Sequence, residues 1–314
     1  MSDDNNLWEQ KKRAILKVRA KMLNSARVWF NQQGFTEVQG PILIPATGEW
    51  AGHFEVKYFD KKAYLGQGLQ LYADSFVASL GKVYTVAPAF RADKVSTPRH
   101  LAEYWGIEAA APECDLEGII RVQEELMMYI CHSLSVDAEE ELKTLNRNVE
   151  DIQKVRTPFP RITYEKAVEM LQKDKEHIFW GQPISWELEK KLSLRFSQPF
   201  FVTDFPVGNE TFFYKSNPQR SELTLSADLL APEGYGEIAG GGQMIMEREV
   251  LIKKMVEEGI APADQQWYIN LRPLGSGPQS EFMIGIERFI QWLCKMEHIK
   301  EATAYPRLPD NIYP

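Results

Sequence analysis

Residues able to bind phosphate gather around a polar loop between two expected strands. Arg91 follows the expected strand 83–90, and Arg99 precedes the next expected strand, 104–110, which begins with Tyr104. A guanidinium matches a phosphate group with parallel hydrogen bonds, and an aromatic ring offers a surface on which a base can stack. The pattern indicates an antiparallel hairpin with a long loop at its tip. That loop is either a phosphate site or a solvated basic loop.

A second candidate lies in the segment 236–243, where three consecutive glycines follow Glu237. Consecutive glycines cost backbone entropy in a strand, and they often mark a place where a ligand or another backbone comes close. The Glu237 carboxylate suits a Mg²⁺ ion that bridges phosphate groups. The alternative is a glycine bulge at a sheet edge.

A third candidate is the segment 285–288, Gly-Ile-Glu-Arg, at an expected strand-to-helix junction. Arg288 would lie at a helix N-terminus, where the helix dipole disfavours a cation. We therefore expect an anionic or aromatic group beside it. An ordinary ion pair with Glu287 is the alternative.

The elements that must position these segments indicate an α+β fold. Ile15, Val18, Met22 and Trp29 recur at helical spacing and predict a long first helix, which Gly34 would end. Further helices are expected over 71–80, from Asp115 to about residue 130, and over 247–258. Strands are expected over 35–38, 41–45, 83–90, 104–110, 200–204, 212–214, 223–230 and 282–285.

The run 41–45 has a proline at each end, which suits an edge strand or an interface. Residues 137–195 are charged and are expected to be helical. Antiparallel strands outnumber βαβ units, and neither GxGxxG nor GxxxxGK[ST] occurs. A Rossmann or P-loop fold is therefore disfavoured.

The composition excludes several classes of protein. The chain has 314 residues and a net charge of −8, which gives no indication of DNA binding. Three scattered cysteines argue against a disulfide framework or a structural zinc site and fit a cytoplasmic protein. The charged first thirty residues do not read as a signal peptide, and no apolar run is long enough to span a membrane.

The order of these segments resembles the three motifs of class II aminoacyl-tRNA synthetases. The segment 40–45 resembles motif 1, the segments 90–93 and 99–108 resemble motif 2, and 285–288 resembles motif 3. The segment 224–238 and the C-terminal residues resemble the asparaginyl and aspartyl enzymes in particular. The resemblance implies a class II synthetase core, with an antiparallel sheet of six to seven strands flanked by helices.

The resemblance also implies roles for individual residues. Arg91 would bind the α-phosphate, and Arg288 and Tyr104 would hold the adenine. Together with Glu237, the two arginines would form the catalytic set, and Glu237 would hold Mg²⁺ with help from Glu108. The expected ATP-binding residues are Arg91, Asp93, Arg99, His100, Leu101, Tyr104, Glu237, Ile238, Gly285 and Arg288. The expected substrate-binding residues are Glu49, Gln70, Glu103, Glu108, Met244, Glu281 and Met283.

The chain departs from the family pattern in its expected substrate pocket. Met244 stands where the family has an arginine that holds the substrate side chain, and Ala73 stands where aspartyl enzymes have a lysine. Glu281 and Met283 replace glycines. A methionine cannot pair with a carboxylate, so we expect a substrate that is less acidic at its far end and is read by Glu281, with a cationic substrate as one alternative.

Residues 1–314 are expected to form a single catalytic domain without the N-terminal anticodon-binding domain of the family. Three functions are compatible with the resemblance. The first is an AMP-forming, asparagine synthetase-like ligase that adenylates an amino acid and transfers the acyl group to ammonia or an amine. Its cofactors would be ATP and Mg²⁺, and it would be a homodimer. Under this reading, tRNA, DNA and membranes are not expected as partners. The second is an asparaginyl- or aspartyl-type aminoacyl-tRNA synthetase without its anticodon domain. The third is a non-catalytic amino-acid-binding regulator, which the retained ATP-binding residues disfavour.

Overall fold

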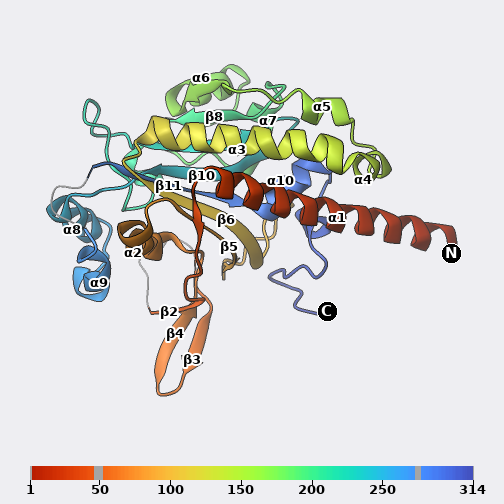
Figure 1. Cartoon of the computed structure of the whole chain (residues 1–314). Coiled ribbons are helices and arrows are strands. Elements are labelled where there is room, and N and C mark those ends of the chain that lie inside the picture. Colours follow the sequence, from red (N-terminus) through yellow and green to blue (C-terminus); the bar gives the residue numbers. More distant parts are fainter. Residues whose placement is uncertain (1, 46–51, 273–276, 314) are drawn as a thin grey trace.

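The fold is built on an eight-stranded, mostly antiparallel sheet (Figure 1). The computed structural model describes residues 2–45, 52–272 and 277–313, without the side chains of residues 2–8 and 70. The strands of this sheet are β1 (Thr36–Glu37), β5 (Val83–Phe90), β6 (Glu103–Pro112), β7 (Arg161–Thr163), β8 (Phe200–Thr203), β9 (Ser226–Ala231), β10 (Gly236–Gln243) and β11 (Gln279–Gly285). Their spatial order is β1-β5-β6-β11-β10-β9-β8-β7.

The expected α+β core is confirmed, but the expected six to seven strands are too few. The pairings of β1 with β5 and of β7 with β8 are parallel, and the other pairings are antiparallel. The outer strand β1 lies within the strand expected over 35–38, whereas β7 was not expected, because its three residues are too few to show a hydrophobic period. The strand expected over 212–214 does not form, because this segment makes only an isolated bridge from Tyr214 to Met244.

A second sheet of three short strands extends from the main body (Figure 1). Its strands are β2 (Leu43–Ile44), β3 (Glu55–Tyr58) and β4 (Lys61–Leu65), in the order β2-β4-β3. The prediction that 41–45 holds an edge strand is confirmed, since β2 pairs with β4 alone among the described strands.

The helices agree with the sequence pattern at their ends. The first helix ends before Gly34, whose positive φ of 75° is a conformation that glycine adopts readily. Asp115 caps the third helix by accepting a hydrogen bond from the Gly118 N–H, at 2.8 Å. The helices are α1 (Ser2–Gln32), α2 (Gln70–Leu80), α3 (Leu116–Asp137), α4 (Glu139–Thr144), α5 (Val149–Gln153), α6 (Tyr164–Lys173), α7 (Trp186–Ser193), α8 (Arg248–Glu257), α9 (Gln266–Ile269) and α10 (Ile286–Leu293), with the 3₁₀ turns η1 (Val207–Asn209), η2 (Pro262–Gln265) and η3 (Ile299–Ala302).

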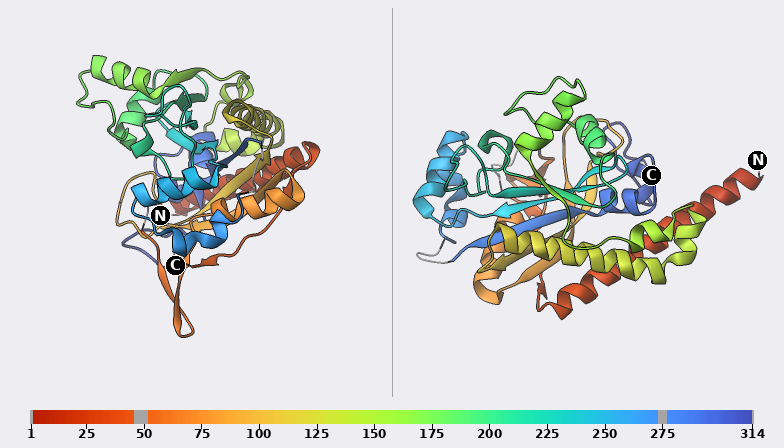
Figure 2. Two further views of the ribbon diagram at one scale, coloured as in Figure 1. Left: turned by 90° about the vertical axis from the view of Figure 1, so that its left-hand side faces the viewer. Right: turned by 90° about the horizontal axis from the view of Figure 1, so that it is seen from above.

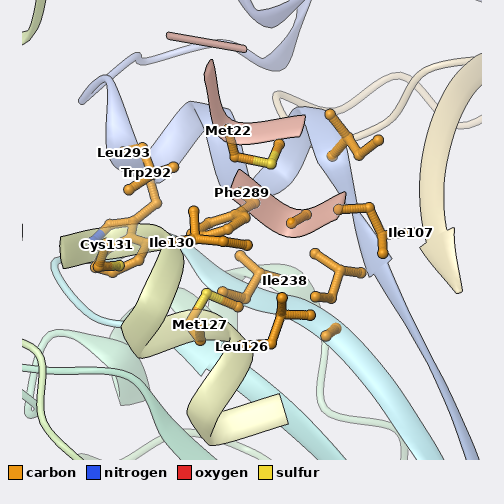
Figure 3. Close-up of a cluster of buried hydrophobic side chains, with 14 of the residues drawn as sticks. Met22, Ile107, Leu126, Met127, Ile130, Cys131, Ile238, Phe289, Trp292 and Leu293 are labelled. Carbon is orange, nitrogen blue, oxygen red and sulfur yellow. The ribbon is translucent and has the colours of Figure 1, made fainter. Parts of the chain in front are cut away.

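The largest hydrophobic core lies between one face of the main sheet and the helices α1, α3 and α10 (Figure 3). Figure 2 shows α1 and α3 side by side, and Met22 of α1 and Ile130 of α3 are both fully buried. Ile107 on β6 and Ile284 on β11 reach this core from the sheet. The opposite face of these strands is thereby left for other contacts.

The region 137–195 is largely helical, as expected, but it also contains β7. Helix α6 packs against β8 and α7 packs against β9 and β10, and both contribute to a smaller core that contains Phe200 and Leu171. No helix among residues 2–45, 52–272 and 277–313 is long and apolar enough to cross a membrane.

Candidate active site

A cavity of about 320 Å³ opens on the face of the main sheet that the large core does not cover. Successive side chains of a strand point to opposite faces. Tyr104 and Glu108 on β6 and Met283 on β11 therefore line the cavity, while Ile107 and Ile284 point into the core.

The basic residues that the sequence analysis expected to bind ATP line one end of the cavity. Arg91 follows β5, Arg99 and His100 come from the loop before β6, and Arg288 lies in the first turn of α10. The expected ATP-binding residues that also line the cavity are Leu101, Tyr104, Glu237, Ile238 and Gly285.

Arg288 pairs with Glu237 at this end, with 2.8 Å between Nη1 and Oε2. Burial opposes ionisation of Glu237, but Arg288 and Arg99 outweigh it and lower the pKa of this carboxyl below its ordinary value. The expectation of an anionic partner for Arg288 is confirmed. The alternative pairing with Glu287 is wrong, because Glu287 pairs with Arg19 at 2.7 Å.

Arg99 and His100, in the loop of the segment that resembles motif 2, are both bonded to other residues of the chain. Arg99 lies 2.5 Å from Glu189 Oε2 and donates to the main-chain carbonyl of Glu237. His100 Nδ1 lies 2.5 Å from Thr97 Oγ1. Burial, together with Arg288, Arg91 and Arg99, lowers the pKa of His100 to about 4, so its imidazole is neutral near pH 7.

Besides Met244, which is described below, four expected site residues are not placed in the cavity by the described structure. Asp93 lies beside it, pairs with Arg91 at 3.1 Å and accepts a hydrogen bond from the Gly52 N–H. Glu103 is exposed at the start of β6. Glu49 lies outside the described residues, and so does the side chain of Gln70 at the start of α2.

The glycine run of β10 is explained by neighbouring protein atoms. A Cβ on Gly241 would lie 2.5 Å from the carbonyl oxygen of Glu281, and a Cβ on Gly242 would lie 2.7 Å from that of Leu225. The alternative of a glycine bulge at a sheet edge is wrong, because the three glycines pair regularly with both neighbouring strands. A register shift does occur in β10, between Glu237 and Ala239, but β10 is an inner strand of the sheet.

Asp228 and Glu210 are cavity residues that the sequence reading missed. Asp228 on β9 is opposite Gly240 of β10, and a Cβ on that glycine would lie 3.0 Å from Asp228 Oδ1 and 4.0 Å from Glu237 Oε1. Burial, followed by the charge of Glu237, raises the pKa of Glu210 to about 8. The register of a β9–β10 hairpin that turns between Ala231 and Gly236 is the signal that would have placed Asp228 and Glu237 on the same face, since Glu237 pairs with Leu230, two residues from Asp228.

The carboxylates of Asp228 and Glu237 fit Mg²⁺, which prefers one or two carboxylates together with phosphate oxygens. Glu108, which was expected to help Glu237 hold Mg²⁺, has other contacts. Both of its oxygens accept the Leu69 N–H at 2.8 Å, and β11 lies between its strand and β10. Among the described residues, no group of three or more His, Cys, Asp or Glu is arranged to hold a metal ion.

The other end of the cavity holds the changed substrate residues. Glu281 and Met283 line it, together with Ala73 and Tyr214. Met244 does not line it. This residue is fully buried in a separate cluster with Phe212 and Phe213, so its expected place in the substrate pocket is wrong.

Comparison with known proteins agrees with this geometry. Residues 5–309 match the family model described as tRNA synthetases class II (D, K and N). The asparagine–tRNA ligase of Thermococcus gammatolerans is 39% identical over 310 residues, which cover 98% of this chain and 72% of the relative. The asparagine–tRNA ligase of Desulforamulus reducens is 38% identical over 317 residues, covering 100% of this chain and 74% of the relative.

Solved structures give the same result. The asparaginyl-tRNA synthetase of Pyrococcus horikoshii, complexed with asparaginyl-adenylate, superposes with a TM-score of 0.94 at 37% identity, over 100% of this chain and 74% of that one. The asparaginyl-tRNA synthetase of Entamoeba histolytica, with the same adenylate, gives 0.89 at 30% identity, over 96% of this chain and 69% of that one.

Proposed function

The chain belongs to the class II tRNA synthetases of the aspartate, lysine and asparagine group, and on that premise we propose that it is an asparaginyl-type enzyme that aminoacylates tRNA. Enzymes of this family are ligases that use ATP to form an aminoacyl-adenylate. The observation that carries the proposal is the meeting of Arg91, Tyr104, Glu237 and Arg288 in one cavity. This cavity lies on a chain that is 39% identical, over 98% of its length, to an asparagine–tRNA ligase.

The first function expected from the sequence is thereby corrected. Transfer of the acyl group to ammonia or an amine without tRNA is contradicted by similarity, along nearly the whole of this chain, to asparagine–tRNA ligases of several organisms. The expectation that tRNA is not a partner is corrected for the same reason. The second function weighed, an asparaginyl- or aspartyl-type synthetase, has the better support.

The reaction needs no nucleophile from the protein. A carboxylate oxygen of the amino acid attacks the α-phosphorus of ATP, and the bond from that phosphorus to the leaving pyrophosphate breaks. Arg91 offsets the charge that builds on the α-phosphate, and Arg288 and Tyr104 hold the adenine from either side. A hydroxyl of the terminal ribose of tRNA then attacks the acyl carbon, and AMP leaves. Positioning and fixed charges supply the rate.

Mg²⁺ is part of the proposal, with Glu237 and Asp228 as its protein ligands. When bound, the ion offsets charge on the phosphate groups. Arg99, held by Glu189, presents a further fixed positive charge at the same end of the cavity. Neutral His100 adds a hydrogen-bonding group without adding charge.

A homodimer and a cytoplasmic location also belong to the proposal. Ile42 and Leu43, in the segment that resembles motif 1, are 46% and 44% exposed, and a second copy would cover this apolar surface. The single catalytic domain expected over 1–314 stays a prediction.

The test has two steps. Pyrophosphate exchange into ATP is measured with Mg²⁺ and each amino acid in turn, and aminoacylation of total tRNA is then measured with the best amino acid. Exchange followed by charging of tRNA is the expected result. Exchange with no charging of any tRNA would remove the second step from the proposal, and no exchange with any amino acid would overturn it.

A further inference from the structure

The cavity has two chemically different ends. Gly285 of β11 pairs with Gly106 of β6 beside the adenine-binding Arg288, and Glu281 pairs with Ala110 at the opposite end. Four residues of extended strand separate Gly285 from Glu281, which corresponds to about 13 Å. An α-phosphate and an amino acid would fill this length, so Glu281 lies where the amino acid side chain ends.

The residues opposite Glu281 on the two neighbouring strands have little or no side chain. Its partners in the sheet are Ala110 on β6 and Gly242 on β10. The ring of Tyr214 closes over Gly242, since a Cβ there would lie 2.9 Å from Tyr214 Cδ1. Glu281 is only 6% exposed, yet it lines the cavity, so its carboxylate forms part of a narrow wall with Tyr214 and Ala73.

Charge is distributed unevenly between the two ends. Among the cavity residues that the structure describes, the cationic ones are Arg91, Arg99 and Arg288, all at the adenine end. Arg272 interacts electrostatically with Glu281, but it is buried, pairs with Asp74 and does not line the cavity. A substrate group at this end therefore faces a carboxylate.

From this geometry we infer that Glu281 determines which amino acid the enzyme accepts. Its carboxylate accepts a hydrogen bond from an N–H group at the end of the substrate side chain, either a carboxamide or an ammonium group. An ionised carboxylate has acceptors and no donor, and two carboxylates in contact repel each other. Aspartate is thereby excluded. The inference rests on the proposed function and names the substrate class of the same site.

Stable mimics of the adenylate test this without requiring turnover. Three sulfamoyl-adenosine conjugates are compared, carrying asparagine, aspartate or 2,4-diaminobutyrate, and their binding is measured by calorimetry. The proteins are the wild type, Glu281→Gln, Glu281→Ala and the control Glu125→Gln, which removes the same charge from the exposed face of α3. Thermal unfolding of each variant establishes that it is folded.

The wild type is expected to bind the asparagine or the diaminobutyrate conjugate more tightly than the aspartate conjugate. Glutamine keeps the size of Glu281 but can both donate and accept, so Glu281→Gln should reduce this preference by about tenfold or more. Glu281→Ala should weaken binding of the preferred conjugate, and Glu125→Gln should change nothing. The preferred conjugate identifies whether the substrate carries a carboxamide or an ammonium group.

Two results separate the possible failures. Equal binding of the aspartate conjugate by the wild type, or an unchanged preference in folded Glu281→Gln, would overturn the role of Glu281 and leave the proposed function standing. No binding of any conjugate would overturn the proposed function itself, and the inference with it.

Discussion

Arg288 Nη1 lies 2.8 Å from Glu237 Oε2, and this ion pair joins the first turn of α10 to β10 across the floor of the cavity. One partner is assigned to the adenine and the other to the metal. Each therefore holds the other in place before ligands bind, and a change at either residue affects both functions.

Replacing Arg288 by alanine removes the adenine contact and leaves the partly buried Glu237 carboxylate without its ion-pair partner. We expect Arg288→Ala to lower kcat/KM for pyrophosphate exchange by about two to three orders of magnitude. Steady-state kinetics at varied ATP measures this. The control is Arg248→Ala, since Arg248 is exposed at the start of α8. Exchange at the wild-type rate in Arg288→Ala would remove the adenine contact from the mechanism.

Asp228 is expected to act with Glu237 on the metal. Asp228→Asn keeps the shape of the side chain and removes one charge, so half-maximal exchange should require about ten times more Mg²⁺. The measurement is the exchange rate as a function of Mg²⁺ at saturating ATP. Glu108→Gln is the comparison, because Glu108 accepts the Leu69 N–H instead. An unchanged Mg²⁺ requirement in Asp228→Asn, with a raised one in Glu108→Gln, would restore the sequence-based assignment.

The neutral state of His100 predicts how stability depends on pH. Its folded pKa is about 4, below its ordinary value of 6.5, because of burial and the nearby arginines. Between these two values the unfolded chain binds more protons than the folded one, so His100 lowers the free energy of unfolding as the pH falls from 6.5 towards 4. Thermal melts across this range should show a smaller loss in His100→Gln than in the wild type. An equal loss of stability with falling pH in both proteins would contradict the assignment of a neutral His100.

Gly241 tests the packing of the central strands. A Cβ there would lie 2.5 Å from the Glu281 carbonyl oxygen and 2.6 Å from Phe282 Cβ, and the backbone of a central strand cannot move away easily. Gly241→Ala should reduce the free energy of unfolding by about 1–3 kcal/mol. Gly208→Ala is the matched control, because nothing lies within 4 Å of a Cβ at that position. Urea unfolding compares the two variants, and equal stabilities would refute the packing account.

Local sequence patterns were sufficient for the long elements. The period of Ile15, Val18 and Met22 predicted α1, and Asp115 predicted the start of α3, because a helix face and a helix cap depend on neighbouring residues. The loop that presents Arg91 between two antiparallel strands was also predicted. The strand expected over 35–38 contains β1, but β7 was not expected, since its pairing depends on a partner that lies far away in the sequence.

The same division holds for the active site. The sequence alone identified Arg91, Glu237 and Arg288, because their motifs are local, and it determined the membership of the chain in its family. Only the tertiary structure decided that Asp228 stands beside Glu237 and that Met244 is buried away from the cavity. Asp228 and Glu237 share a face because of the register between β9 and β10. Met244 follows the end of β10 and packs in a cluster of segments that are distant in the sequence, which local patterns cannot reveal.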